Sequence, residues 1–233
     1  MVGAMIIGIT GKAGSGKDTA ADILVDGFGF RKISLADPMK RAVMDWFGFS
    51  HNQLWGPSEM RNAPDKRYVR VPAHEEPCFR TDEWGHSWEK GTAYVPDQYL
   101  TPRHALQQLG TEFGRACYQD VWIDFAIRTA KRVLAGQAYT PNFGLELYES
   151  MNPARGVVIP DVRFANELAA IRKAGGRVFR IERQGAGLTG VAAAHASERE
   201  QEGFTDADVE TIRNDGTLED LATALRWAIN SEL

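Results

Sequence analysis

A chain of 233 residues is long enough for one α/β domain with a sizeable core, or for such a domain carrying an insertion. Its residues are 43% hydrophobic and 25% charged, as in ordinary globular proteins, and its formal net charge of −4 argues against a general nucleic-acid coat, which must neutralise phosphates. The chain has no membrane-length apolar stretch, no recognisable signal peptide and no paired cysteines. We therefore expect a cytoplasmic protein that binds neither membranes nor nucleic acids.

The N-terminal part predicts a strand, a helix, a second strand and a second helix. The apolar run Met5–Thr10 predicts a buried strand, and residues 17–28 carry apolar side chains at helical spacing before closing glycines. A second strand is expected over Arg31–Ala36. Asp37 and Pro38 then begin another helix, because aspartate suits a helix cap and proline suits the first turn.

The segment 49–100 has a different texture. It holds five of the ten prolines and three of the six tryptophans, without sustained periodicity. Its aromatic content favours a folded lid or insertion over a linker, within a core formed by 1–48 and 101–233. A zinc site at His74, Cys78 and His86 is disfavoured, because no Cys-x-x-Cys spacing is present. Basic side chains in this segment are candidates for closing over phosphates (Arg61, Lys66, Arg67, Arg70 and Arg80).

Regular elements return after residue 100. Thr101 and Pro102 begin a helix whose apolar stripe is Leu106, Leu109 and Phe113. We expect further helices over 120–134, 164–174 and 217–230, the last capped by Thr217, and strands over 156–162, 177–182 and 209–212. Strands that alternate with helices predict an α/β fold, a three-layer sandwich with a mostly parallel central sheet.

A glycine-rich loop, Gly11–Lys17, lies between the first predicted strand and helix. Its glycines let backbone N–H groups wrap a phosphate, and the following helix N-terminus favours an anion. Lys17 would bridge the outer phosphates of a nucleotide. The alternative is a glycine-rich turn without a ligand.

The residue after Lys17 departs from the usual phosphate-binding motif, which has serine or threonine there. Asp18 occupies the position, and a carboxylate repels a triphosphate unless it points away or meets a metal through water. Thr19, one place later on the first helical turn, is then the hydroxyl candidate for Mg²⁺. Which of the two faces the metal stays open.

Two aspartates follow predicted strands, at the sheet edge where ligands of parallel sheets bind. Asp37 is a candidate for orienting an acceptor phosphate, with Lys40 and Arg41 one turn later, or it is only a helix cap. Asp161 has the position of a Walker-B-like carboxylate that holds Mg²⁺, again with a cap as the alternative. Arg163 is a candidate phosphate contact. The Asn166 and Glu167 that follow can simply start the next helix.

Four polar residues recur at four-residue spacing in the helix after Pro102, and so share one face (Arg103, Gln107, Thr111 and Arg115). Two arginines suit a monophosphate, and glutamine suits the edge of a base. A solvated helix face explains the same spacing. Asn214 lies in a turn before the last helix, where a simple turn with a helix cap is the alternative to a nucleotide contact.

Several of these stretches resemble one family. Gly-Lys-Asp-Thr, "LTPRHALQQLGTEFGR", "DVW" with Trp122, and "DVRFANE" resemble phage deoxynucleoside monophosphate kinases, which are P-loop kinases. The resemblance covers most of the chain, weakly in 49–100. It implies transfer of a phosphoryl group from ATP to a deoxynucleoside monophosphate (dNMP) with Mg²⁺, in the host cytoplasm if the protein is phage-encoded, and a possible homodimer. "IRNDGTLEDL" resembles the adenine-side loop of related kinases, including dephospho-CoA kinase.

The residues and the resemblance together assign roles. We expect catalysis by Lys17, Asp37 and Arg163, and metal binding by Thr19 and Asp161. ATP is assigned to Gly14, Ser15, Gly16, Lys17, Asp18, Thr19 and Asn214. The dNMP is assigned to Lys12, Asp37, Lys40, Arg41, Arg103, Gln107, Thr111, Arg115 and Trp122.

Two alternatives to this reaction remain. The first is another small-molecule P-loop kinase, similar to dephospho-CoA kinase or phosphomevalonate kinase. The second, from a different class, is a nucleotide-gated ATPase or switch, although the chain has no Asn-Lys-x-Asp motif for reading guanine. The base of the dNMP, modified bases included, and the oligomeric state stay open.

Overall fold

The computed structural model describes residues 5–70, 99–150, 152–186, 204–205 and 207–231. The chain divides into two compact units. The first unit comprises Met1–Pro38 and Gly114–Leu233, and the second comprises Met39–Phe113. Each unit is described by itself.

The first unit is built on a five-stranded sheet in the order β2-β7-β1-β8-β9, in which every pair is parallel. The strands are β1 (Met5–Thr10), β2 (Phe30–Lys32), β7 (Gly156–Ile159), β8 (Arg177–Glu182) and β9 (Glu210–Arg213). Nearly every residue of β1 and β7 is buried, because both faces of the sheet are covered. Because these strands are parallel, the carboxyl ends of β1, β7 and β8 lie at the same edge of the sheet.

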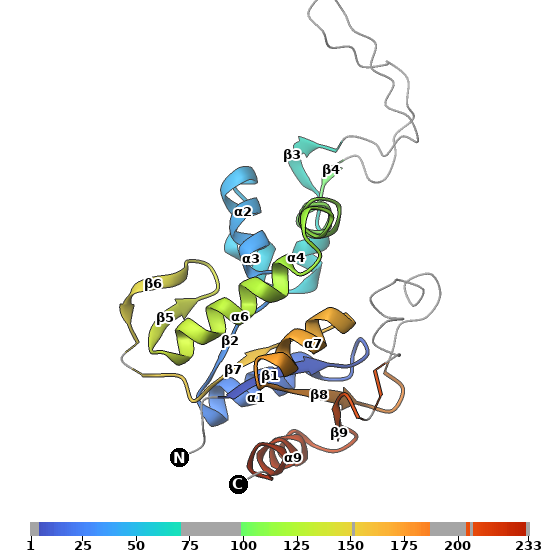
Figure 1. Ribbon diagram of the computed structural model, residues 1–233. Helices are drawn as coiled ribbons and strands as arrows, with labels where there is room; N and C mark the ends of the chain where they lie inside the picture. The colour runs from blue at the N-terminus through green and yellow to red at the C-terminus, as the bar shows by residue number, and fades with distance from the viewer. Residues whose placement is uncertain (1–4, 71–98, 151, 187–203, 206, 232–233) are drawn as a thin grey trace, which may run out of the picture. The chain divides into compact units, whose positions relative to one another are not determined.

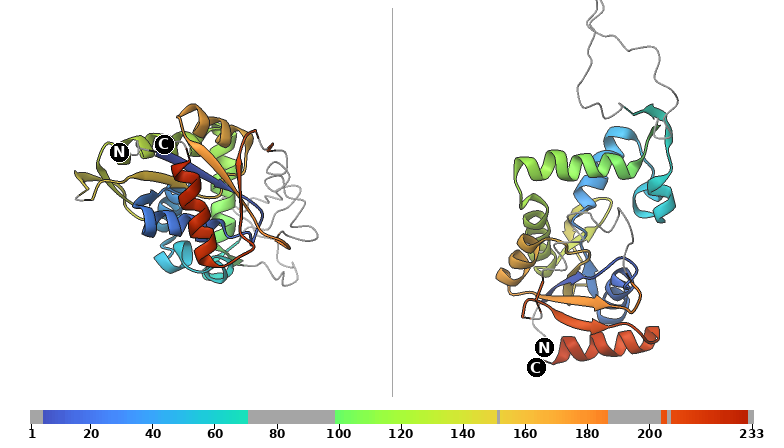
Figure 2. Two further views of the ribbon diagram at one scale, coloured as in Figure 1. Left: turned by 90° about the horizontal axis from the view of Figure 1, so that it is seen from below. Right: turned by 90° about the vertical axis from the view of Figure 1, so that its right-hand side faces the viewer.

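Helices cover both faces of this sheet (Figure 1). The helices α1 (Lys17–Phe28) and α9 (Leu218–Asn230) pack over one face, onto Ile7, Ile9 and Phe179 among others. The helices α6 (Val121–Leu134) and α7 (Ala165–Lys173) pack over the other. Figure 2 shows α9 lying beside α1 on its face. This arrangement confirms the predicted three-layer α/β sandwich with a parallel central sheet, and it is consistent with the expected P-loop kinase-like fold.

The second strand is shorter than the predicted Arg31–Ala36. β2 ends at Lys32, and Ile33 makes one more bond to the backbone of β7. The backbone N–H of Ser34 then donates to the Asp37 carboxylate at 3.0 Å, and this hydrogen bond replaces one within the sheet. The chain turns into the next helix at that point, because a local side-chain acceptor competes with the strand.

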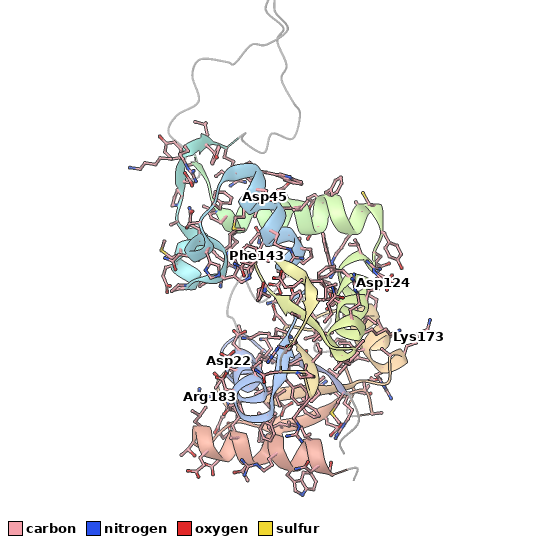
Figure 3. The ribbon with its side chains drawn as sticks, turned by 90° about the vertical axis from the view of Figure 1, so that its left-hand side faces the viewer. Asp22, Asp45, Asp124, Phe143, Lys173 and Arg183 are labelled. Carbon is pink, nitrogen blue, oxygen red and sulfur yellow. The ribbon has the colours of Figure 1, made fainter. Side chains whose placement is uncertain are left out.

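An antiparallel hairpin was not predicted. It consists of β5 (Gln137–Thr140) and β6 (Gly144–Glu149), which follow α6. Phe143, labelled in Figure 3, lies in the exposed turn between the two strands. Apolar and polar residues do not alternate clearly along the hairpin, so its sequence gives little strand signal. Tyr139 is the residue of β5 that enters the core.

The second unit contains α2 (Asp37–Phe47), which starts at the end of the first unit, and then α3 (His51–Trp55) and α4 (Ser58–Asn62). It continues with the antiparallel strands β3 (Asp65–Val69) and β4 (Tyr99–Leu100), and with α5 (Pro102–Gln107). Its core joins Val43, Phe49, Leu54 and Ala105. The unit is therefore longer than the expected 49–100, because the flanking helices share that core. His74, Cys78, Arg80 and His86 lie outside the described residues.

The helix after Pro102 begins as predicted, with Thr101 accepting a bond from the His104 N–H. Its second half is a π-helix, η1 (Gln108–Arg115), in which residues four apart no longer stay in line. Leu106 and Leu109 pack against the core of the second unit, but Phe113 is 62% exposed. The prediction that Phe113 continues the apolar stripe was wrong for this reason. Within the described residues, no helix is long and apolar enough to cross a membrane.

Candidate active site

The glycine-rich loop connects β1 to α1 and has a backbone that only glycine adopts easily. Gly11, Gly14 and Gly16 all have positive φ, at 140°, 78° and 100°. A Cβ on Gly11 would lie 2.4 Å from the Ile181 carbonyl oxygen, so this position has no room for a side chain. Gly16 is the N-cap of α1 and supplies no side-chain acceptor to the first turn. The loop thus presents backbone N–H groups at a helix N-terminus, which suits a phosphate.

Lys17 lies back over this loop. Its Nζ donates to the Gly11 carbonyl oxygen at 2.6 Å and to the Lys12 carbonyl oxygen at 3.0 Å. The same Nζ is 4.0 Å from Oδ1 of Asp161, which follows β7. The sequence prediction that Lys17 and Asp161 belong to one site is consistent with this distance. The roles assigned to them remain predictions.

Asp18 and Thr19 are both exposed on the first turn of α1. Thr19 lines a shallow groove together with Asp22 and Leu218, the first residue of α9. Neither Asp18 nor Thr19 lines the larger pocket beside the loop. Metal binding by either residue therefore stays a prediction.

A pocket of about 770 Å³ lies between the loop and the carboxyl ends of β8 and β9. Its lining is rich in charged side chains (Lys12, Arg180, Glu182, Arg183, Arg213 and Asp215). Arg183, labelled in Figure 3, follows the end of β8. The three arginines were missed, although the end of a parallel strand next to the loop is a position where ligand contacts are expected.

Two buried hydroxyls also line this pocket. Thr10 Oγ1 and Ser15 Oγ have no hydrogen-bond partner among the described residues, and each side chain belongs to a residue only 1% exposed. Buried polar atoms are normally satisfied, so unpartnered ones beside a pocket favour a polar ligand there. Ser15 was assigned to a nucleotide from the sequence, whereas Thr10 was not.

Asn214 connects the turn after β9 to the loop. Its backbone N–H donates to the Glu182 carbonyl oxygen at 2.7 Å, and its Nδ2 donates to the Ser15 carbonyl oxygen at 2.8 Å. A Cβ on Gly16 would lie 2.3 Å from this Nδ2, so the amide covers the loop closely. The structure places Asn214 at the predicted site, with its side chain bonded to the loop backbone.

Asp37 is buried at the start of α2, with 2% of its surface exposed. Its Oδ2 accepts from the Tyr139 hydroxyl at 2.7 Å and from the Ser34 N–H at 3.0 Å. Asp37 is therefore more than a helix cap, because a tyrosine 102 residues away also holds it. No sequence signal near Tyr139 indicated this contact.

Changing Tyr139 to phenylalanine is expected to lower the free energy of unfolding by about 2 kcal/mol, because a buried carboxylate loses a hydroxyl donor. Urea unfolding measures the change. Tyr118→Phe is a matched control, since the Tyr118 hydroxyl donates to Asp124 at 2.8 Å but the residue is 52% exposed. A loss no larger in Tyr139→Phe than in the control would contradict the structural importance of the contact.

Asp161 has an unusual backbone. It has φ = 67°, and no other non-glycine residue in the described part of the chain has positive φ. Such conformations carry strain and are concentrated at functional sites. Its Oδ2 accepts from Nη2 of Arg163 at 2.9 Å, and the side chain is 47% exposed. The carboxylate is thus accessible beside Lys17 and Arg163.

A buried glutamate lies below this turn. Glu167 accepts from the Arg163 N–H at 2.8 Å and from Nη2 of Arg115 at 2.6 Å. Burial raises the pKa of the Glu167 carboxyl, against the opposing effect of these donors. The Arg115 guanidinium also lies over the Phe164 ring, 4.0 Å from its centroid. The structure therefore brings Arg115 to the turn that carries Asp161 and Arg163.

The other predicted contacts divide between the units. Trp122 is half-buried on α6 in the first unit. Five residues assigned to the acceptor lie in the second unit (Lys40, Arg41, Arg103, Gln107 and Thr111). There, Nζ of Lys40 lies 5.3 Å from the centroid of Trp55, and Arg103 donates to the Ser58 hydroxyl at 2.9 Å. Gln107 and Thr111 are exposed.

The arrangement in the first unit suits a phosphorylated ligand and a divalent cation. Loop N–H groups, Lys17 and Arg163 supply positive charge, and Asp161 supplies one accessible oxygen donor. Within the described ranges, no three His, Cys, Asp or Glu side chains gather into a metal cage. One carboxylate combined with phosphate oxygens and water is the set that Mg²⁺ commonly takes.

Comparison with known proteins agrees with this chemistry. No family model matches the chain. A protein of Acanthamoeba polyphaga mimivirus named "Putative deoxynucleotide monophosphate kinase" is 30% identical over 212 residues, which are 90% of this chain and 89% of the viral protein. The crystal structure of TT1252 from Thermus thermophilus matches over 99% of this chain and 98% of that one, with 17% identity and a TM-score of 0.39. The identity to the viral protein over nearly the whole of both chains shows that this chain belongs to the deoxynucleotide monophosphate kinase family.

Proposed function

We propose that the protein transfers the γ-phosphoryl group of ATP to a dNMP, forming a deoxynucleoside diphosphate and ADP, and so supplies precursors for DNA synthesis. The observation that carries the proposal is the grouping of the loop, Lys17 and Asp161 at one edge of the sheet, with Nζ of Lys17 4.0 Å from Asp161. The kinase named among the relatives supports the same class of substrate.

The donor nucleotide is assigned to the loop and the adjoining pocket. Loop N–H groups and Lys17 bind the outer phosphates, because both supply positive charge at a helix N-terminus. The pocket of about 770 Å³ is in the range that holds small ligands, and it continues from the loop along β8 and β9. The hydroxyls of Thr10 and Ser15 would gain their hydrogen bonds from the bound nucleotide.

Asp161 is the residue that fits Mg²⁺, with Thr19 or Asp18 as a second contact on α1. When bound, Mg²⁺ would supply positive charge that offsets the negative charge developing during phosphoryl transfer. Lys17 keeps the γ-phosphoryl group in place beside it. The backbone strain at Asp161 is consistent with a side chain that is held in one direction for a ligand.

The acceptor phosphate is assigned to Arg115 and Arg163, with Asp37 at the adjacent strand end. An oxygen of the dNMP phosphate attacks the γ-phosphorus, the bond to the β–γ bridging oxygen breaks, and ADP leaves with the electron pair. A monophosphate near pH 7 is largely deprotonated, so the attack needs no protein base. The residues align the two phosphates, neutralise charge and exclude water.

A panel of acceptors tests this proposal. Purified protein with ATP and Mg²⁺ is offered each dNMP, base-modified dNMPs, dephospho-CoA and phosphomevalonate at matched concentration, and products are separated by chromatography. We expect one or more dNMPs to yield diphosphates. Phosphorylation of dephospho-CoA or phosphomevalonate alone would favour the other small-molecule kinases, and ATP hydrolysis unaffected by every dNMP would favour a nucleotide-gated ATPase.

A further inference from the structure

Glu167 is a buried carboxylate near the candidate site, and both of its oxygens accept hydrogen bonds. Oε2 accepts from the backbone N–H groups of Arg163 and Phe164 at 2.8 and 3.2 Å, while Oε1 accepts from Nη2 of Arg115 at 2.6 Å. The residue is 2% exposed. Arg115 is 52 residues away in the chain, so the contact joins two separate segments of the first unit.

A helix cap alone does not account for this arrangement. Capping the N-terminus of α7 uses one carboxylate oxygen on the backbone, as Oε2 does here, and capping residues usually stay in water. Burying a carboxylate is unfavourable unless a charge partner and hydrogen bonds compensate for its lost hydration. Arg115 supplies that partner through the other oxygen. The second oxygen therefore indicates a role beyond the cap.

The two oxygens hold two different parts of the candidate site. Oε2 fixes the backbone of Arg163, whose side chain bonds to the Asp161 carboxylate at 2.9 Å. Oε1 fixes Arg115, whose guanidinium is also held against the Phe164 ring. One carboxylate thus sets the turn that carries the proposed metal ligand and the arginine assigned to the acceptor.

We propose that Glu167 is a positioning residue that holds Arg115 in the direction needed to bind the acceptor monophosphate beside Asp161 and Arg163. A guanidinium has five N–H donors, so Arg115 can bond to Glu167 and still donate to a phosphate. The Arg115 side chain is 19% exposed, so part of it is accessible to a ligand. The inference rests on the proposed function, because it takes a dNMP as the ligand of Arg115.

Glu167→Gln tests the proposal with little change of shape. Glutamine keeps one oxygen for the backbone N–H groups of the cap, but its amide loses the charge that pairs with Arg115. We expect KM for the dNMP to rise about 10-fold or more while KM for ATP stays within about 2-fold, since the hydrogen bond to a charged group is lost at the acceptor side. A residue with a merely structural role would lower thermal stability and leave both KM values in place.

A double-mutant cycle identifies the path of the effect. If Glu167 acts through Arg115, then Glu167→Gln in an Arg115→Gln background raises KM for the dNMP no further. Glu210→Gln is the matched control, because Glu210 also pairs with an arginine, Arg177, but lies on β9 away from Arg115. Its KM values are expected to match the unaltered protein. Full additivity of the two substitutions, or an unchanged KM in Glu167→Gln, would overturn the proposal.

Failure of the proposed function gives a different result. If the acceptor panel finds another phosphorylated substrate in place of every dNMP, the proposed reaction is wrong, and the same cycle is run with that substrate. Calorimetric binding of the acceptor without ATP gives a second readout that does not require turnover. Weakened binding in Glu167→Gln, absent in the Arg115→Gln background, supports the positioning role for whichever acceptor binds, and unchanged binding contradicts it.

Discussion

Lys17→Ala is expected to reduce phosphoryl transfer by about 10³-fold or more while leaving the fold intact. Lys17 ends the loop, and its Nζ donates to the Gly11 carbonyl oxygen and lies 4.0 Å from Oδ1 of Asp161. A positioned charge that stabilises a transferring phosphoryl group contributes a factor of this size or more. The side chain packs on the loop rather than in either apolar core, so its loss leaves the core packing unchanged.

Initial rates with a saturating acceptor measure the effect, and circular dichroism during heating reports the fold. Lys173→Ala is the matched control, because Lys173 is an exposed lysine at the end of α7 (Figure 3). We expect the control to retain its activity. Transfer by Lys17→Ala at the rate of the control would remove the loop from the donor site.

Asp161→Asn is expected to lower turnover by about 10²-fold and to weaken the dependence on Mg²⁺, because the amide loses the negative charge that suits a divalent cation. Asparagine is the sharpest substitution at this position. Like aspartate it tolerates positive φ, so the backbone at φ = 67° is retained and the charge alone changes. Turnover measured over a Mg²⁺ titration checks both parts of the expectation.

The control for this substitution is Asp208→Asn. Asp208 also pairs with an arginine, Arg172 at 3.1 Å, but it is held by Thr205 at a turn and does not line the pocket at the loop. Its turnover is expected to be unchanged. A Mg²⁺ titration of Asp161→Asn that overlays the control would show that Asp161 is only a structural turn residue.

The elements with strong local signals could be predicted from the sequence. β1, β8 and the helices α1, α6 and α9 lie within a residue or two of their predicted bounds, because apolar periodicity and end signals are local properties. Thr217 caps α9, as expected, and Asp220 completes a capping box with it. The hairpin β5–β6 was missed because its own sequence has no clear strand pattern. Its stability comes from packing on α6, which a local sequence pattern does not reveal.

The candidate site divides in the same way. The loop and the aspartates after β2 and β7 could be found because a strand end in a parallel sheet is a predictable position. Contacts between distant segments could not, such as Tyr139 with Asp37 and Arg115 with Glu167. The sequence prediction placed residues four apart on one face of the helix after Pro102. The π-helix η1 changes which of these side chains share a face.

The proposed reaction is tested most directly by following the γ-phosphoryl group itself. ATP labelled in the γ-phosphate is incubated with the protein, Mg²⁺ and the preferred dNMP, and the label is located by chromatography. The proposal predicts that the label appears in the deoxynucleoside diphosphate in equal amount to the ADP formed, and that Lys17→Ala abolishes both. Label recovered only as inorganic phosphate, at a rate indifferent to the dNMP, would contradict it.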